Sequence, residues 1–460
     1  MNKLTSIVLT TLPLWIAAGA ACLHAAPAAA AEKPNILFIV ADDMGYADCG
    51  VHGCKDVPTP NLDSLAKGGI RFTDGYVTGA VCSPTRAALM TGRHQLRDGV
   101  PTWIQPGKPG LNAGVPTLAD YLKKAGYHTA IVGKWHLGEQ DQCNPLNRGF
   151  DEFFGFLGGG HHYIARPNGK GEYNAPILRN REPLNEQRYL TDAFGEEAAG
   201  FISRQKGKEQ PFFLYLAFNA VHTPLEATDD YLQRFAKIED KQRRAYAAML
   251  SAMDDSVGKV LKAVRDAGIE EQTLVYFISD NGGPITRNSP NASLNTPLRG
   301  GKGETWEGGI RVPFILKWPG HLKAGTAFTQ PVIQMDVMAT MLALTGVEVD
   351  SKWPIDGVNL MPFLNAPEKG AAPHRMLCWE FGPQWAIRED RWKLTYAWPG
   401  KGAKQPILGL YDLSEDISES HDLSTEQPEL VKKLQSDWNV WRKDVDGDRP
   451  TPKTKTSSLK

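Results

Sequence analysis

The sequence predicts an α/β fold, in which helices flank a large, mostly parallel sheet and a smaller C-terminal subdomain adds an antiparallel sheet and a helix. Three observations support this prediction. Short apolar runs alternate with helical patterns from about residue 35 to about residue 346, which is typical of a parallel sheet. Polar clusters follow the ends of these runs, where ligands bind in such sheets. After about residue 350, short runs rich in aromatic and β-branched residues indicate antiparallel strands.

The elements of the α/β part can be predicted in order along the chain. The first strand is expected in NILFIV (35–40), an apolar run bounded by a proline and two aspartates. A threonine before the helical pattern and two glycines after it favour a short helix in TPNLDSLAKGG (59–69). The expected elements that follow are the helix TLADYLKKAGY (117–127), the strands HTAIVGK (128–134), PFFLYLAF (211–218) and TLVYFISD (273–280), and a long helix at 241–267.

The C-terminal part has a different pattern of residue types. Its expected elements are strands within MLCWEFG (376–382), WAIREDRWKLTYA (385–397) and LGLYDLSED (408–416), followed by a helix at 426–443. The polar end of the chain is expected to be disordered. We therefore divide the chain into a signal peptide (1–31), a main α/β domain (32–349), an antiparallel subdomain (350–445) and a tail (446–460).

The N-terminus is typical of a signal peptide. Lys3 precedes the apolar stretch SIVLTTLPLWIAAGAACLHA, and small residues offer cleavage sites before Glu32. A membrane anchor and, because of Cys22, a lipoprotein are the alternatives; Pro13 and the alanine-rich end favour cleavage. We expect a periplasmic or secreted protein with no membrane span after cleavage.

The balance of charge excludes broad classes of partner. The chain has 51 Lys and Arg against 52 Asp and Glu, a formal net charge of -1, so no nucleic-acid partner is expected and anion binding must be local. Five cysteines remain after the signal peptide. Cys49 and Cys54 are close enough in sequence to bridge, but the pairing of Cys49, Cys54, Cys143 and Cys378 stays open. Because five is an odd number, at least one of these cysteines has no partner for a disulfide within the chain, and we expect that cysteine to have another function.

Polar residues that follow the strands suggest a common site. Taken singly, each has a structural interpretation, such as a turn or a packed histidine. Because the carboxyl ends of parallel strands meet at one edge, we expect them to lie together. The oxygen-bearing residues Asp42, Asp43, Asp280 and Asn281 suit Ca²⁺ or Mg²⁺. The cationic and proton-transferring candidates are Arg86, Lys134, His136, His222 and Lys302, a set suited to transfer of a tetrahedral oxyanion group.

The stretch CSPTRAALMTG (82–92) resembles the sulfatase signature C-x-P-x-R-x-x-x-[LM]-T-G at every defined position. GKWHLG resembles the second signature of that family, and ADDMGYADCG, SDNGG and RGGKGETWEGGIRVPFILKWPG resemble its metal-binding and substrate-side blocks in the same order. The chain is thus identified as similar to the type I, formylglycine-dependent sulfatases, a family of arylsulfatases and carbohydrate sulfatases. The resemblance implies an alkaline phosphatase-like fold and makes 32–349 the catalytic domain.

The resemblance also implies a role for each candidate. Cys82 would be oxidised to Cα-formylglycine (3-oxoalanine) by a maturing enzyme that reads CSPTR, and its hydrate would attack sulfur. Asp42, Asp43, Asp280, Asn281 and the matured Cys82 would hold one Ca²⁺. Arg86, Lys134 and Lys302 would offset charge on the sulfate, His222 with help from Lys302 would protonate the leaving oxygen, and His136 would take a proton from the second hydroxyl. A buried structural cysteine and a thiolate nucleophile are the alternatives for Cys82.

The substrate is expected to be a sulfated polysaccharide or oligosaccharide. His161 and His162 stand where many relatives have a serine near the sulfate, so either is a candidate for binding sugar or sulfate. Aromatic residues that could stack on sugar rings are Trp103, Tyr163, Trp306, Trp379, Trp385 and Trp398, although most are expected to belong to the core or rim. The alternatives are a phosphate or phosphonate ester hydrolase of the same superfamily, and a sulfated-glycan binding protein without activity.

Overall fold

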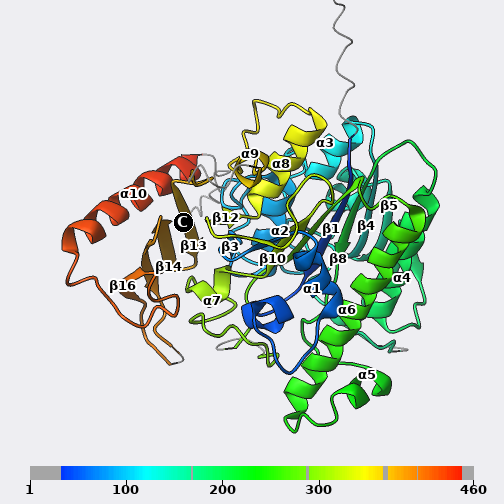
Figure 1. The fold of residues 1–460 in the computed structure, drawn as a ribbon, viewed down its shortest axis with the longest axis horizontal. Helices are drawn as coiled ribbons and strands as arrows, with labels where there is room; N and C mark the ends of the chain where they lie inside the picture. The colour runs from blue at the N-terminus through cyan, green and yellow to red at the C-terminus, as the bar shows by residue number, and fades with distance from the viewer. Residues whose placement is uncertain (1–32, 167–168, 286–289, 366–370, 401, 448–460) are drawn as a thin grey trace, which may run out of the picture. The chain divides into compact units, whose positions relative to one another are not determined.

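A ten-stranded sheet forms the centre of the molecule. The computed structural model describes residues 33–166, 169–285, 290–365, 371–400 and 402–447. The strands, in their order across the sheet, are β11 (Thr326–Phe328), β2 (Ile70–Phe72), β10 (Phe314–Lys317), β9 (Thr273–Ser279), β1 (Asn35–Ala41), β8 (Phe212–Ala217), β4 (His128–Lys134), β5 (Glu152–Phe156), β6 (Ile177–Arg179) and β7 (Glu182–Leu184). The five from β9 to β5 are parallel, whereas β10 pairs antiparallel with β9 and β6 with β5. The prediction of a mostly parallel sheet is confirmed (Figure 1).

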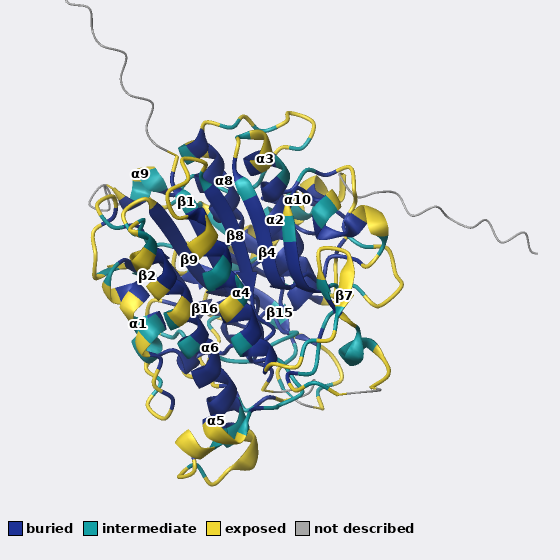
Figure 2. Cartoon of the chain, turned by 90° about the vertical axis from the view of Figure 1, so that its right-hand side faces the viewer, coloured by how far each residue is buried: buried dark blue, intermediate teal, exposed yellow. Residues whose placement is uncertain are grey.

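Helices cover both faces of this sheet. Successive side chains of a strand point to opposite faces, and in β1 Leu37 and Ile39 join one core cluster while Ile36 and Phe38 join another. The first cluster is completed by α1 (Pro60–Lys67), α4 (Leu190–Gln205) and α6 (Lys241–Ala267), and the second by α2 (Cys82–Thr91), α3 (Leu118–Lys124) and α8 (Met335–Thr345). Burial on both faces explains why these strands are continuous apolar runs (Figure 2).

A four-stranded antiparallel sheet follows in the C-terminal part. Its strands are β13 (Met376–Phe381), β14 (Gln384–Glu389), β15 (Trp392–Ala397) and β16 (Ile407–Asp412), in that order. One face, with Cys378 and Ile387, packs on Leu434 of α10 (Pro428–Gly447). The other face, with Trp379, packs on residues of the main part, and the Trp379 indole donates to the carbonyl of Val77 over 2.8 Å.

The remaining elements are short and connect these layers. They are β3 (Gly75–Tyr76) paired with β12 (Val332–Ile333), the helices α5 (Asp229–Arg234), α7 (Glu307–Ile310) and α9 (Met361–Leu364), and 3-10 turns at Tyr46–Asp48, Gly50–His52, Asp141–Cys143, Pro145–Asn147 and Glu172–Asn174.

Some sequence predictions fall partly or wholly outside the described residues. The signal peptide at 1–31 does so, and the tail at 446–460 does so from residue 448, because residues 446 and 447 end α10. The division at 349/350 stays a prediction. No described helix is long and apolar enough to cross a membrane. The cysteines at 49, 54, 82, 143 and 378 are all free, so the part of the chain that is described contains no disulfide.

Candidate active site

The side chains singled out in the sequence lie at one edge of the main sheet. Asp42 and Asp43 follow β1, and the Asp280–Asn281 pair follows β9, its neighbour on one side. On the other side, His222 comes shortly after β8, and Lys134 is the last residue of β4. Parallel pairing carries the carboxyl ends of these four strands to the same edge, so residues far apart in the sequence meet.

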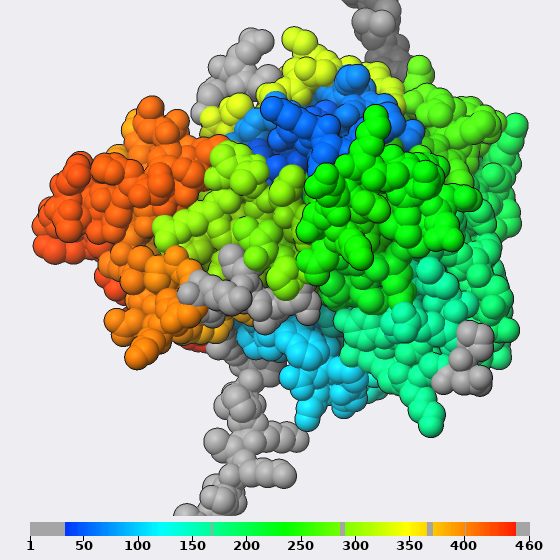
Figure 3. All heavy atoms as spheres, turned by 90° about the horizontal axis from the view of Figure 1, so that it is seen from below, coloured from blue at the N-terminus to red at the C-terminus, as the bar shows by residue number. Residues whose placement is uncertain are grey.

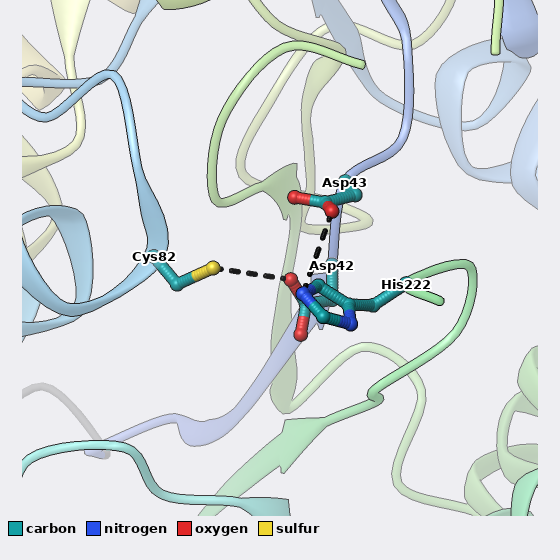
Figure 4. Close-up of side chains that lie close together, drawn as sticks. All are labelled: Asp42, Asp43, Cys82 and His222. Atoms are coloured by element: carbon teal, nitrogen blue, oxygen red, sulfur yellow. Dashed lines mark hydrogen bonds and ion pairs between the residues drawn. The ribbon is translucent and has the colours of Figure 1, made fainter. Parts of the chain in front are cut away.

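Four of these side chains form a compact cluster. One ligand atom from each of Asp42, Asp43, Cys82 and His222 lies within 4.8 Å of the others. The Cys82 thiol donates to Asp42 Oδ1 over 3.5 Å, and His222 Nε2 lies 3.7 Å from Asp43 Oδ2 (Figure 4). The cluster therefore joins the start of α2 to the ends of β1 and β8.

Three cationic side chains offset the buried carboxylates. The pairs are Lys134 Nζ with Asp42 Oδ2, Lys302 Nζ with Asp43 Oδ1 at 2.6 Å, and Arg86 Nε with Asp280 Oδ2 at 3.0 Å. Burial raises the pKa of Asp42, but Lys134 and the neighbouring cations outweigh burial and hold that pKa below its usual value. The same competition between burial and Lys302 leaves the pKa of Asp43 lowered. Both aspartates are therefore carboxylates at neutral pH.

The acidic cluster fits a hard divalent cation. Asp280 Oδ1 accepts from the backbone N–H of Asp43 over 3.2 Å, and Asn281 Nδ2 donates to Asp43 Oδ1 over 2.7 Å. The amide oxygen of Asn281, in contrast, is buried and has no hydrogen-bond partner. A buried acceptor left without a partner costs about 1–3 kcal/mol, and a cation would satisfy it. Carboxylate and amide oxygens are the ligands that Ca²⁺ prefers.

Cys82 is held as a neutral thiol. Its residue is 3% exposed, and Lys302 Nζ donates to its sulfur over 3.4 Å. Burial, followed by the charges of Asp280 and Asp42, raises the pKa of Cys82 to about 12. A reactive cysteine instead needs a lowered pKa, because the thiolate is the nucleophile. This environment argues against Cys82 acting as a thiolate.

The two histidines present different nitrogens to the site. His222 Nδ1 lies 2.6 Å from the Thr223 carbonyl, which can only accept, so Nδ1 carries the proton and Nε2 faces Asp43. His136 Nε2 lies 3.2 Å from the Ile104 carbonyl, which leaves its Nδ1 buried and without a hydrogen-bond partner. Burial lowers the pKa of both histidines, most strongly for His136.

Two residues at the site adopt a left-handed backbone. Asp43 has φ 61° and His136 has φ 57°. A non-glycine residue in this region is strained by roughly 1–3 kcal/mol and persists only where the surroundings enforce it. Both residues lie in the turn after a strand, where Asp43 joins the cluster and the His136 ring contacts the Ile104 carbonyl.

A cavity of about 750 Å³ opens from this cluster. Cys82, His136, His222 and Lys302 line it together with Trp103 and Trp398. Residues that sequence reasoning missed also line it, namely Glu172, Tyr173, Phe381, Pro383 and Gln384. The first two lie in the 3-10 turn at Glu172–Asn174, and the last three lie where β13 ends and β14 begins, so their positions in the sequence give no sign of a place at the site.

His161 and His162 do not line this cavity. They line a neighbouring one of about 240 Å³. His161 Nε2 lies 2.7 Å from the Ala175 carbonyl, and His162 Nδ1 lies 2.9 Å from Glu226 Oε1, so both rings already have partners. A role of either histidine in binding sugar or sulfate stays a prediction.

The candidate sugar-stacking aromatics divide into two groups. Tyr163, Trp306 and Trp379 are buried in the core, and the Trp385 ring stacks on Trp438 of α10. The Tyr163 hydroxyl donates to the carbonyl of His222 over 2.8 Å, which supports that residue's loop. Trp103 and Trp398 alone of the six line the cavity.

Comparison with known proteins relates the whole described chain to one family. The family model described as Sulfatase matches residues 34–347, and the model described as N-sulphoglucosamine sulphohydrolase, C-terminal, matches residues 302–444. N-acetylgalactosamine-6-sulfatase of Mus musculus is 38% identical over 356 residues, which cover 73% of this chain and 67% of that protein.

Two solved structures extend this similarity to the fold. The structure of Ps i-CgsB in complex with k-i-k-neocarrahexaose matches with a TM-score of 0.83 and 38% identity, covering 92% of this chain and 94% of that one. The PsFucS1 sulfatase from Pseudoalteromonas sp. matches with a TM-score of 0.77 and 26% identity, covering 91% of each chain.

Proposed function

Because the chain belongs to the sulfatase family and is a sulfuric ester hydrolase with an alkaline phosphatase-like fold, we propose that it is an exported, calcium-dependent formylglycine sulfatase acting on sulfated carbohydrates. One observation carries the formylglycine part of this proposal. Cys82 is a buried thiol with a pKa of about 12, yet it stands at the centre of paired carboxylates and cations. A cysteine placed there is of little use as a thiol and suits conversion to another group.

The carbohydrate substrate is supported by the relatives. One relative is N-acetylgalactosamine-6-sulfatase, and Ps i-CgsB was solved in complex with k-i-k-neocarrahexaose. The cavity also has the size and mixed polar and aromatic lining of a site for a drug-sized polar ligand. We propose a sulfated polysaccharide or its oligosaccharides as the substrate class.

A single Ca²⁺ would be held by Asp42, Asp43, Asp280 and Asn281, with the matured Cys82 beside it. When bound, the ion would supply positive charge to the sulfate oxygens during transfer. The unpartnered amide oxygen of Asn281 and the two aspartates with lowered pKa support this assignment. Lys134, Lys302 and Arg86 hold the carboxylates in place by ion pairs.

Formylglycine at position 82, made by a maturing enzyme that reads CSPTR, would supply a hydrated aldehyde as nucleophile. Around it, Lys302 lies 3.4 Å from the Cys82 sulfur and lines the cavity, so its ammonium group can contact a sulfate bound there. Lys134 and Arg86 lie behind the carboxylates and contribute charge at longer range. Fixed positive charge of this kind stabilises the transferring group without reorganisation.

The two histidines would each transfer a proton, in different steps of the reaction. His222 lines the cavity, and a bound sulfate would raise its pKa, because a nearby negative charge favours the protonated ring. Protonated at Nε2, His222 would donate to the leaving alcohol oxygen. His136 keeps an unprotonated Nδ1 and would accept the proton that is released when sulfate leaves.

Export would depend on residues 1–31 as a cleaved signal peptide, with the mature protein periplasmic or secreted. This part of the proposal rests on the sequence pattern. Mass spectrometry of the intact protein from its native host tests it, because cleavage before Glu32 removes a mass that can be calculated.

The decisive experiment is the mass of the tryptic peptide from Phe72 to Arg86. Trypsin releases it whole, because no Lys or Arg lies between Arg71 and Arg86. In protein from the native host we expect an aldehyde in place of the Cys82 thiol. An unmodified thiol in active enzyme would overturn the formylglycine mechanism.

Activity assays on the same protein distinguish the proposed sulfatase from the two alternative functions. Turnover of 4-nitrophenyl sulfate but not of 4-nitrophenyl phosphate is expected, and Cys82→Ala protein serves as the inactive control. Faster cleavage of the phosphate would favour the phosphate or phosphonate ester hydrolase. Absence of turnover for every ester would favour a glycan-binding protein.

A further inference from the structure

The cavity extends beyond the groups that would act on the sulfate ester. Its inner part is formed by buried residues, with Cys82 at 3% and His136 at 5% exposure. Its outer part is lined by Trp103, which is 45% exposed, and by Trp398 with the β13–β14 turn. The whole cavity, about 750 Å³, falls in the range that encloses a drug-sized ligand, and one sulfated ring would not fill it.

Trp103 is an exposed aromatic residue whose neighbour in the chain is held by two hydrogen bonds. Its neighbour Ile104 donates its backbone N–H to Ser83 Oγ over 3.0 Å, and the Ile104 carbonyl lies 3.2 Å from His136 Nε2. Ser83 follows Cys82 in α2. These two bonds fix the Trp103 backbone beside the inner part of the cavity and leave its ring at the mouth.

Trp398 is tied to the cavity from the C-terminal sheet. Its carbonyl accepts from the Trp306 indole over 2.7 Å, and its N–H donates to Gln384 Oε1 over 3.4 Å. Gln384 Nε2 in turn donates over 2.8 Å to the carbonyl of Gly303, the residue after Lys302. Figure 3 shows the face where the C-terminal sheet, in orange, and the segment near residue 100, in light blue, both reach the surface.

We infer that Trp103 and Trp398 bind the sugar rings that adjoin the sulfated ring, an inference that rests on the proposed function. The enzyme thus prefers a sulfated oligosaccharide or polysaccharide over a sulfated monosaccharide. Aromatic side chains provide large apolar contact area with little loss of side-chain entropy, and a pyranose ring offers a matching apolar face.

Glu172 adds a constraint on the charge of those rings. Among the described residues that line the cavity it is the one acid, and its Oε1 accepts from the Gly159 N–H over 2.9 Å. Its other oxygen can accept from sugar hydroxyls, whereas an acidic sugar beside it would be repelled. The ring beside Glu172 is therefore expected to present hydroxyl groups, and not a sulfate or carboxylate, to this residue.

The test compares three sulfate esters in wild-type and Trp103→Ala enzyme. The esters are 4-nitrophenyl sulfate, galactose 4-sulfate and k-i-k-neocarrahexaose. We expect wild-type kcat/KM to be at least about 10-fold higher for the hexaose than for the monosaccharide. Trp103→Ala should lower kcat/KM for the hexaose by about 3- to 10-fold through KM, and by a smaller factor for the aryl sulfate, which has no adjoining sugar ring. Ile407→Ala, which removes an exposed apolar side chain elsewhere, is the matched control.

Calorimetry on Cys82→Ala protein decides the question independently of turnover. The hexaose should bind, and adding Trp103→Ala or Trp398→Ala should weaken it several-fold. Equal kcat/KM for monosaccharide and hexaose, or equal hexaose affinity with and without Trp103, would overturn the inference. Tighter binding of the hexaose to protein that also carries Glu172→Gln would overturn the assignment of Glu172 as an acceptor for sugar hydroxyls. Failure of the proposed function has a different signature, namely no sulfate released from any ester.

Discussion

At the scale of single residues, His222 illustrates how a half-buried histidine can be arranged for proton donation. Its Nδ1 is fixed by the Thr223 carbonyl, so only Nε2 is available to exchange a proton with a ligand in the cavity. Tyr163 holds the carbonyl of the same residue. The orientation of the ring is therefore set before substrate arrives, which is what general acid catalysis requires.

His222→Ala should affect esters according to their leaving group. For an alkyl or sugar sulfate we expect kcat to fall by roughly 10²–10⁴-fold, because the alkoxide must be protonated as it leaves. For 4-nitrophenyl sulfate, whose phenolate is a stable leaving group, the loss should be small. Measuring kcat across aryl sulfates of graded phenol pKa checks this.

His128→Ala is the control for that series, since His128 lies at the opposite end of β4 and pairs with Glu152. It should leave the dependence on phenol pKa unchanged. A loss in His222→Ala that was equal for good and poor leaving groups would contradict the assignment.

The sequence predicts some site residues better than others for a physical reason. Asp42 and Asp280 directly follow strands with clear apolar runs, and parallel pairing brings such positions together. Glu172 lies in a three-residue 3-10 turn, which is too short to show a periodic pattern in the sequence. Gln384 reaches the site only because the C-terminal sheet packs against the main part, and its position at the start of β14 gives no sign of that contact in the sequence.

At the scale of elements, buried charges join the C-terminal sheet to the main part. Lys393 of β15 lies 2.8 Å from both Glu307 of α7 and Glu419. Arg311 also pairs with Glu307. Burial opposes ionisation of both glutamates, but Lys393 and Arg311 lower the pKa of Glu307 to about 2, while burial raises the pKa of Glu419 to about 7.

These opposite shifts predict opposite effects of pH. Folded protein retains the Glu419 proton between the usual glutamate pKa of 4.5 and about 7, whereas unfolded chain loses it, so stability falls as pH rises through this window. Glu419→Gln should remove that loss. The free energy of unfolding in urea, measured from pH 4.5 to 8, should therefore shift in favour of the variant by up to about 3 kcal/mol.

Glu307→Gln is the contrasting variant. The lowered pKa of Glu307 contributes stability above pH 4.5 that is lost only as pH falls toward about 2. Removing its charge takes one buried carboxylate from Lys393 and Arg311, which keep Glu419 and Asp74 as partners, and should cost up to about 3–5 kcal/mol at neutral pH. If Glu419→Gln were as destabilising as Glu307→Gln at pH 7, the division of charge between them would be wrong.

Helices and strands with a strong sequence pattern are predicted better than short ones. The helix predicted at 241–267 has those bounds in the structure, because it is long and amphipathic and ends at Gly268 with φ 73°. Strands β6 and β7 have three residues each, too few to show a period of two. Their pairing depends on the neighbouring β5 rather than on their own composition.

At the scale of the whole molecule, the proposed cation site connects distant parts of the chain. Its carboxylates follow β1 and β9, which are adjacent in the sheet but more than two hundred residues apart in sequence. An ion that binds only this assembled site stabilises the folded state as a whole. Ion binding should therefore be visible in global unfolding.

Calcium is expected to raise the melting temperature of the metal-free protein by a few degrees. At a concentration of about 100 times Kd, binding contributes about 2.7 kcal/mol. Asn281→Leu, which removes the unpartnered oxygen, should lose most of this rise and weaken calcium binding in calorimetry. Asn144→Leu alters a buried asparagine that caps a turn elsewhere, so it should lower the melting temperature and retain the calcium-dependent rise. If calcium raised the melting temperature of Asn281→Leu as much as that of the wild type, this set of calcium ligands would be wrong.

The burial of α2 has a consequence for the timing of biosynthesis. Every residue from Cys82 to Arg86 is buried in the folded chain. A maturing enzyme therefore cannot bind this segment once folding is complete. On the proposed function, modification of Cys82 must then precede folding, and the two processes compete while the chain is being made. A molecule that folds first stays a thiol for its lifetime, so the active fraction of a preparation records the outcome of that competition and cannot be raised later by adding the modifying enzyme.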